Sequence, residues 1–278
     1  YDEELNNYVN SDEDRILLIS AKAGLGKTML LANFAKNFND NYNDIKLYKR
    51  FCGASDLSSQ TLSLWKSILY EAGITEDDDL YPNNTDELKR NMPDILNAIA
   101  SKGPSLIVID AINQIPNGIY MLKWLKKLPD NLKMIISIKE DEEDKEFHEL
   151  LTEIKDKKEL FHNFELKELE DEKIVGLIEN YLNNYLKELS KEQIEIIKSS
   201  DGSKNPLYLK ILLAELRVFG SFEQLQDEIS EFGENPKTAF DHVLDRLEKD
   251  EKYLPGDNIV PLIFSYLAYA RVGLSEDE

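Results

Sequence analysis

The amino-acid sequence predicts an α/β fold in which a parallel β-sheet is followed by a helical part. The first observation is a set of short apolar runs, at 16–19, 106–109 and 134–138, separated by segments of helical periodicity. Continuous apolar runs, as opposed to alternating ones, are typical of strands buried on both faces. The second is a glycine-rich turn at 21–28, which follows the first run and opens a helix. The third is that only helical spacing is found after about residue 167.

Composition limits the class of protein. The chain has 278 residues, 42% of them hydrophobic, which is enough for one large domain or two smaller ones and excludes a disordered chain. The single cysteine gives no disulfide framework and predicts a reducing, cytoplasmic setting. No apolar run approaches the roughly 20 residues of a membrane-spanning helix, so we expect no membrane partner. Because the chain begins with Tyr1 and stops at Glu278 without an obvious terminus, we expect it to be a piece of a longer protein.

The charge balance is strongly acidic. The formal net charge is −21, from 33 basic and 54 acidic residues. A nucleic-acid surface needs clustered Lys and Arg, so the composition predicts no direct contact with DNA or RNA. The acidic runs at 76–79 and 140–144 are expected to be solvated loops and not metal sites.

The elements of the first part follow from periodicity, in chain order. A short amphipathic helix is expected over 2–10, then a strand at 15–20, the glycine-rich turn and a helix to about Phe38. The remaining expected elements are a strand at 45–51, helices at 59–72 and 85–101, and strands at 106–109, 134–138 and 161–166.

The second part reads as helices throughout. Apolar residues recur at helical spacing from Ile174 to Leu189. Further helices are expected at 190–200, 206–219, 222–232 and 239–250, with breaks at Gly202, Gly220 and Gly233. A last apolar segment, 259–269, begins another structure.

The glycine-rich turn predicts a phosphate-binding loop. Residues 21–28 match the pattern G-x-x-x-x-G-K-[ST] except that Ala21 replaces the first glycine. Backbone N–H groups of such a turn and the start of the next helix bind phosphate, Lys27 can reach the β- and γ-phosphates, and Thr28 can bind Mg²⁺. An ordinary glycine-containing turn is the alternative, which Gly-Lys-Thr in register between strand and helix disfavours. The nucleotide contacts expected here are Ala23, Gly24, Leu25, Gly26, Lys27, Thr28 and Met29.

The strand at 106–109 ends in Asp110, a suitable partner carboxylate for the metal. Hydrolysis also requires a group that activates water, and the nearby candidates are the amides Asn113 and Gln114. An amide cannot take a proton, although glutamine can position water. We therefore expect slow hydrolysis, or a site that residues from elsewhere complete.

Two residues at the end of the 134–138 strand are further candidates. Ser137 and Lys139 are suitably placed to sense the γ-phosphate, and a surface lysine after a strand remains the alternative for Lys139. The three histidines, His148, His162 and His242, are isolated and indicate no metal site of their own.

With these motifs the chain resembles the STAND class of P-loop NTPases, in particular the NACHT-type modules of nephrocystin-like and telomerase-associated proteins. Besides the loop and 110–114, the resemblance is carried by Asn205-Pro206-Leu207-Tyr208-Leu209, by 215–220 and by 270–275. It implies a five-stranded sheet in the order 5-1-4-3-2, then a helical domain and a winged-helix domain. It also implies that Pro206 packs on the adenine and that Tyr8 and Val9 border the base. The implied domains are 1–166 for the nucleotide, 167–252 helical, and 253–278 as the start of the winged helix.

The resemblance further implies a signalling switch that holds ATP or ADP with Mg²⁺ and controls self-association of a longer protein, with sensor and effector domains in the same chain. By analogy, such a switch would act in defence or cell-death signalling. Two alternatives stay open: a continuously hydrolysing motor or clamp ATPase, and a non-enzymatic scaffold with a vestigial loop.

Overall fold

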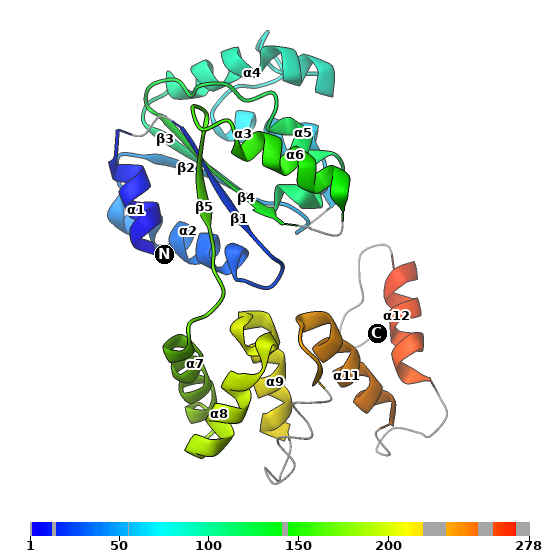
Figure 1. Cartoon of the computed structure of the whole chain (residues 1–278). Helices are drawn as coiled ribbons and strands as arrows, with labels where there is room; N and C mark the ends of the chain where they lie inside the picture. The colour runs from blue at the N-terminus through cyan, green and yellow to red at the C-terminus, as the bar shows by residue number, and fades with distance from the viewer. Residues whose placement is uncertain are drawn as a thin grey trace. The chain divides into compact units, whose positions relative to one another are not determined.

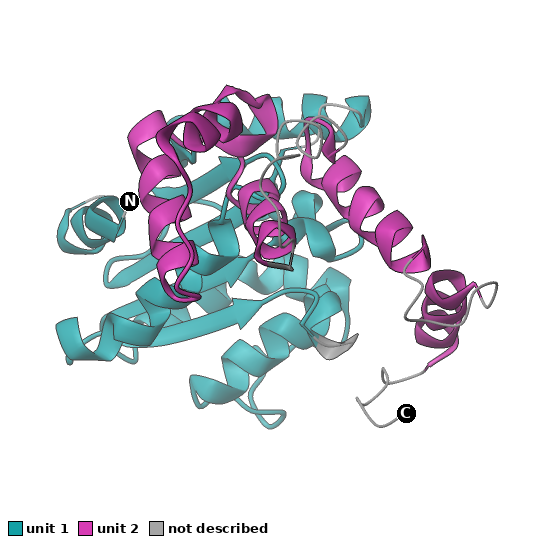
Figure 2. Cartoon of the chain, turned by 90° about the horizontal axis from the view of Figure 1, so that it is seen from below, with its two compact units in different colours: residues 1–167 teal, residues 168–278 magenta. Residues whose placement is uncertain are grey.

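A computed structural model describes residues 2–12, 15–54, 56–140, 144–218, 232–249 and 258–270. The chain forms two compact units, residues 1–167 and 168–278, which Figure 2 colours teal and magenta. We describe each unit by itself.

The first unit is built on a five-stranded parallel sheet (Figure 1). Its strands are β1 (Ile16–Ala21), β2 (Lys46–Phe51), β3 (Ser105–Asp110), β4 (Leu132–Lys139) and β5 (Phe161–Glu165). They lie in the order β2-β3-β4-β1-β5, and every neighbouring pair is parallel. This is the expected order 5-1-4-3-2 read from the other edge, so the α/β fold class and the sheet order are confirmed.

Helices cover both faces of this sheet (Figure 1). On one face α1 (Asp2–Asn10) and α2 (Lys27–Asn41) share an apolar cluster with Leu17 and Ile19 of β1. On the other face Ile16 and Leu18 join a cluster with the four remaining helices. Those helices are α3 (Thr61–Glu71), α4 (Thr85–Ala100), α5 (Gly118–Met121) and α6 (Lys145–Lys155). Neighbouring residues of one strand thus face opposite layers, which is why β1 reads as a continuous apolar run.

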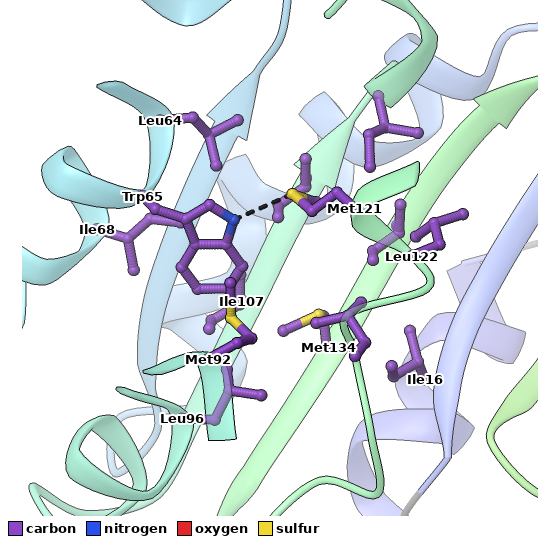
Figure 3. Close-up of a cluster of buried hydrophobic side chains, with 14 of the residues drawn as sticks. Ile16, Leu64, Trp65, Ile68, Met92, Leu96, Ile107, Met121, Leu122 and Met134 are labelled. Carbon is purple, nitrogen blue, oxygen red and sulfur yellow. Dashed lines mark hydrogen bonds between the residues drawn. The ribbon is translucent and has the colours of Figure 1, made fainter. Parts of the chain in front are cut away.

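Trp65 belongs to the second cluster and points toward Met121 (Figure 3). The ring is fully buried, and its Nε1 donates to the sulfur of Met121 at 3.0 Å. Met92 and Met134 are packed nearby in the same cluster. Methionine suits an irregular gap between a sheet and four helices because its side chain is unbranched and adaptable.

In the second unit the described residues form helices and no strand. The helices are α7 (Asp171–Asn183), α8 (Lys191–Ser199), α9 (Pro206–Val218), α11 (Pro236–Lys249) and α12 (Ile259–Tyr269), with a 3₁₀ turn at Asp201–Lys204. Ile178, Tyr208 and Leu212 are among its buried core. Nearly all of the helix expected at 222–232 lies outside the described residues, as do 219–220 and 271–275.

The ion pair between Glu215 and Arg246 joins α9 to α11. The guanidinium donates through two nitrogens, with Nη2 at 3.0 Å from Oε1 of Glu215. By contrast α12 leaves large apolar side chains exposed, among them Leu262, Phe264 and Tyr266. Of the expected winged-helix segment, the structure describes 258–270, so that assignment stays a prediction. Among the described residues, no helix is both long enough and apolar enough to cross a membrane.

Candidate functional site

The loop between β1 and α2 has the backbone that a phosphate-binding turn requires. Gly24 and Gly26 have φ angles of 82° and 92°, in the left-handed region that favours glycine. A Cβ built on Gly26 would meet nothing within 4 Å, so the backbone angle, not lack of space, is the reason for glycine there. Gly26 is the N-cap of α2, whose first N–H groups are left without partners in the helix.

The position of Ala21 explains why no glycine is needed at the first place of the motif. It is the last residue of β1, where it pairs in register with Lys139. Its methyl group is buried in the apolar cluster that includes Leu31 of α2. Extended backbone needs no glycine, so a small apolar residue fits this position.

Lys27 folds back over the loop. Its Nζ donates to the carbonyl oxygens of Ala21 at 2.7 Å and Lys22 at 3.0 Å. Burial lowers the pKa of Lys27 to about 8, against the opposing effect of the Asp110 and Glu140 carboxylates. The ammonium group is thus already desolvated and directed to acceptor oxygens at the loop.

Asp110 lies at the end of β3, with a solvent exposure of 1%. The hydroxyl of Ser137 donates to its Oδ1 at 2.5 Å and accepts from the N–H of Ala111 at 2.8 Å. Ala111 has a φ of 54°, an unusual angle for a residue with a Cβ. Ser137 therefore fixes the carboxylate of Asp110 and the strained turn that follows it.

The two amides after Asp110 are both engaged in structure. Asn113 Oδ1 accepts from the backbone N–H of Lys139 at 2.9 Å, so this side chain ties the turn at 112–114 to the end of β4. Gln114 packs beside Gly53, where an added Cβ would come within 3.3 Å of its Cβ and Cγ. The sequence grouped Asn113 with Gln114 as catalytic candidates, whereas the structure gives Asn113 a positioning contact.

Thr28 and Met29 lie exposed in the first turn of α2. The described residues contain no group of three His, Cys, Asp or Glu side chains that could hold a metal alone. A Mg²⁺ site needs no such group, since this ion takes one or two protein oxygens together with phosphate and water. The Thr28 hydroxyl and the Asp110 carboxylate are both oxygen donors of the required kind.

Tyr8 and Val9 lie near the start of β1 and β4, and their expected place beside a base stays a prediction. The Tyr8 hydroxyl lies 2.8 Å from Arg15 O and 2.9 Å from Met134 O, near the start of β1 and β4. Met134 lies roughly 16 Å along β4 from Lys139, the residue that pairs with Ala21 at the loop. Lys133 Nζ donates to Tyr8 O at 2.9 Å and lies over the ring. Tyr8 and Val9 are buried residues of α1, and the contact with a base was implied by the resemblance alone.

Pro206 belongs to the second unit, where it is the first residue of α9. Asn205 Oδ1 accepts from the N–H of Leu207 at 3.0 Å, as an N-cap side chain does. Proline at the first helical position costs no hydrogen bond, because the N–H that it lacks would have no partner within the helix. Tyr208 is buried and its hydroxyl donates to Gly233 O at 3.0 Å. The Asn-Pro-Leu-Tyr block thus has a structural reason, and the contact of Pro206 with adenine stays a prediction.

One residue near the loop was missed by sequence reasoning, and a second buried residue lies next to Asp110. Glu140, expected in a solvated acidic run, pairs with Lys155, and its side chain is only 17% exposed. Its position directly after a strand that ends beside the loop is the signal that could have found it. Cys52 is buried next to Asp110, whose carbonyl accepts from its N–H at 3.1 Å. Burial, with the charge of Asp110, raises the pKa of the Cys52 thiol to about 12, which makes it unreactive.

Comparison with known proteins shows which proteins this chain resembles. Residues 10–147 match the AAA domain family, a span that runs from the end of α1 into α6 and includes the loop and Asp110. A TPR repeat-containing protein of Dictyostelium discoideum is 24% identical over 84% of this chain, and telomerase protein component 1 of Mus musculus is 23% identical over 95% of it. The chain spans only 16% and 10% of the length of these relatives.

Among solved structures, the Walker-type ATPase PABY2304 of Pyrococcus abyssi is 15% identical, with a TM-score of 0.51. The match covers 99% of this chain and 84% of that one. At this identity the likeness shows the fold, which is that of the P-loop NTPases.

One expectation from composition is corrected. The net charge predicted no direct contact with nucleic acid, but the solved structures that this chain matches include the ORC1 protein of Aeropyrum pernix in complex with DNA. That match is 11% identical, covers 90% of this chain and 64% of that one, and has a TM-score of 0.49. Net charge is a sum over the whole chain, so it does not exclude a local basic surface. The exclusion of nucleic acid was wrong as an inference from charge.

The chain therefore combines a glycine-rich loop at the end of β1, an acid at the end of β3 two places along the sheet, and a matching span over residues 10–147. The fold is that of the P-loop NTPases, and residues 10–147 are similar to the AAA domain family.

Proposed function

We propose that this chain binds ATP and ADP with Mg²⁺ and acts as a nucleotide-controlled switch that hydrolyses ATP slowly. The observation that carries the proposal is the shared edge of the sheet at which the loop 21–28 and Asp110 lie, with Ser137 joining Asp110 to β4. Ligands of parallel α/β sheets bind at this edge.

Phosphate would be bound by the loop and by Lys27. The backbone N–H groups of 23–29, from Ala23 through Leu25 to Met29, would donate to an anion that the start of α2 favours. Lys27, which now donates to two loop carbonyls, would exchange these contacts for phosphate oxygens. A charged donor gains more from an anion than from a carbonyl, so the exchange is favourable.

Mg²⁺ would be held by the Thr28 hydroxyl and phosphate oxygens, with Asp110 acting through a water. When bound, the ion would neutralise charge on the phosphates. Ser137 would keep Asp110 in position, and Lys139 is the cation that the end of β4 offers for the γ-phosphate.

Slow hydrolysis is proposed because no carboxylate follows Asp110. Asn113 is engaged with Lys139, and Gln114, packed on Gly53, can orient water but cannot accept its proton. Such a site would keep a triphosphate bound for a long time before it is hydrolysed. This property suits a switch, in which the two nucleotide states favour different arrangements.

The finer proposal is a STAND-type, NACHT-like switch in which the domains 1–166 and 167–252 close on the nucleotide and Pro206 contacts the adenine. The relationship to telomerase protein component 1, of which the chain spans a tenth, supports a module within a longer protein. Exposed apolar side chains of α12 support a further packed domain from about 253, since a helix apolar on all sides is normally buried. Control of self-association by sensor and effector domains, in the cytoplasm, belongs to the same proposal.

The test is nucleotide binding and turnover by the purified chain. Titration calorimetry with ADP and ATP in the presence of Mg²⁺ should show binding that Lys27→Ala removes, because the lost charge faces phosphate. Phosphate release should be slow at saturating ATP. Brisk turnover would favour a motor or clamp ATPase, and no binding together with no nucleotide in the purified protein would favour a scaffold.

A further inference from the structure

A backbone hydrogen bond holds Glu140 next to Ala21, the first residue of the loop. It is the residue after β4, and its N–H donates to Ala21 O at 2.9 Å, which is also an acceptor of the Lys27 ammonium. The Glu140 side chain is largely buried and accepts a hydrogen bond from Lys155, the last residue of α6. Ala21 O thus brings the backbone of Glu140 and the ammonium of Lys27 to one atom.

Lys27 and Glu140 act on each other electrostatically. The Glu140 carboxylate, like that of Asp110, favours the charged form of Lys27. Burial alone would raise the pKa of Glu140, but Lys155 and the charge of Lys27 hold that pKa below its ordinary value. The carboxylate is therefore ionised at neutral pH beside the lysine that phosphate needs.

We propose that Glu140 sets the selectivity of the site between nucleoside di- and triphosphates, by competing with the terminal phosphate for Lys27. This inference rests on the proposed function. A carboxylate near Lys27 repels each phosphate that comes to this cation, and the repulsion rises with the charge of the phosphate chain. A triphosphate places more charge at the β- and γ-positions that Lys27 reaches, so it is penalised more than a diphosphate.

Lys155 moderates this penalty. Its ion pair with Glu140 neutralises part of the carboxylate charge and anchors it to α6. Without Lys155, the full charge of the Glu140 carboxylate would act on Lys27. Glu140 would then attract Lys27 more strongly. Loss of Glu140 and loss of Lys155 should thus have opposite effects on triphosphate binding, which a merely structural ion pair would not produce.

The experiment measures dissociation constants of Mg-ADP and of the non-hydrolysable analogue Mg-AMPPNP by calorimetry at fixed pH. Glu140→Gln should tighten the triphosphate analogue by about tenfold and ADP by less, whereas Lys155→Met should weaken the analogue. Glu153→Gln is the matched control, because Glu153 also belongs to α6 but pairs with Lys123 at 2.8 Å and with Lys157 at 3.3 Å, neither of which is a loop residue. The effect of Glu140→Gln should shrink in 0.5 M salt, to about half or less of its low-salt value.

An unchanged ratio of the two constants in Glu140→Gln, with both nucleotides bound, would overturn this inference and leave the proposed function standing. Weaker binding of the analogue in both Glu140→Gln and Lys155→Met would also overturn it, since that result indicates a structural pair. No binding of either nucleotide to the unmodified chain would overturn the proposed function and this inference together.

Discussion

Ser137→Ala removes a hydroxyl on which the buried carboxylate of Asp110 and the partly buried N–H of Ala111 depend. Ser137 and Asp110 have exposures of 0% and 1%, and the hydroxyl is both the donor to Asp110 and the acceptor for the Ala111 N–H. A buried N–H left without a partner costs about 1–3 kcal/mol, and a hydrogen bond to a charged group contributes about 1.5–3 kcal/mol. Because the two effects share one group and do not add fully, we expect the first unit to lose about 3 kcal/mol.

Tryptophan fluorescence is the suitable assay. Both tryptophans of the chain, Trp65 and Trp124, are in the first unit and pack in its core, so their signal follows that unit. A loss of about 3 kcal/mol should lower its unfolding midpoint by about 6–12 °C. Mg-nucleotide affinity should fall as well, because Asp110 is no longer held in position.

Ser203→Ala is the matched control, followed by circular dichroism. Ser203 is equally buried, but its hydroxyl has no hydrogen-bond partner among the described residues, so its removal should leave the second unit at least as stable as before. If Ser137→Ala is as mild as Ser203→Ala, the hydroxyl does not support Asp110 and Ala111, and the reasoning is refuted.

Three further predictions concern single residues. Gln114→Glu should raise phosphate release by about tenfold or more if a proton acceptor is the missing group, and no increase would mean that positioning limits the reaction. Leu186→Gly should stabilise the second unit by about 0.5–1 kcal/mol in thermal unfolding, since Leu186 has a φ of 56° and is 97% exposed, and a lower midpoint would mean that its side chain packs. Cys52, with a pKa raised to about 12, should react with Ellman's reagent at pH 8 only after denaturation, because about one thiol in ten thousand is ionised in the native state, and rapid native labelling would contradict its burial.

Much of the site could be predicted from local patterns. A phosphate loop is a continuous strand, turn and helix, so Gly24, Gly26 and Lys27 carry their geometry in consecutive residues. Asp110 follows the same logic, since an apolar run that ends in an acid places the acid at a strand end. The parallel sheet was predicted from buried runs, and its order came from the resemblance.

What could not be predicted depends on contacts between distant residues. The helical spacing of Tyr8 is correct, but only the packed structure shows that its hydroxyl reaches Arg15 and Met134, away from the loop. The acidic run at 140–144 looks uniform in sequence, yet Glu140 is buried by a contact with Lys155 that the run does not reveal.

The sequence by itself determined the loop, the strand-end acid and the class of sheet, because short-range periodicity and turn chemistry specify them. The tertiary structure decided that Ser137 holds Asp110, that Asn113 ties to Lys139, and that Glu140 lies within electrostatic reach of Lys27. The physical reason is register. Parallel pairing of β3, β4 and β1 aligns residues far apart in the chain at one sheet edge, and this alignment exists only once the strands are paired.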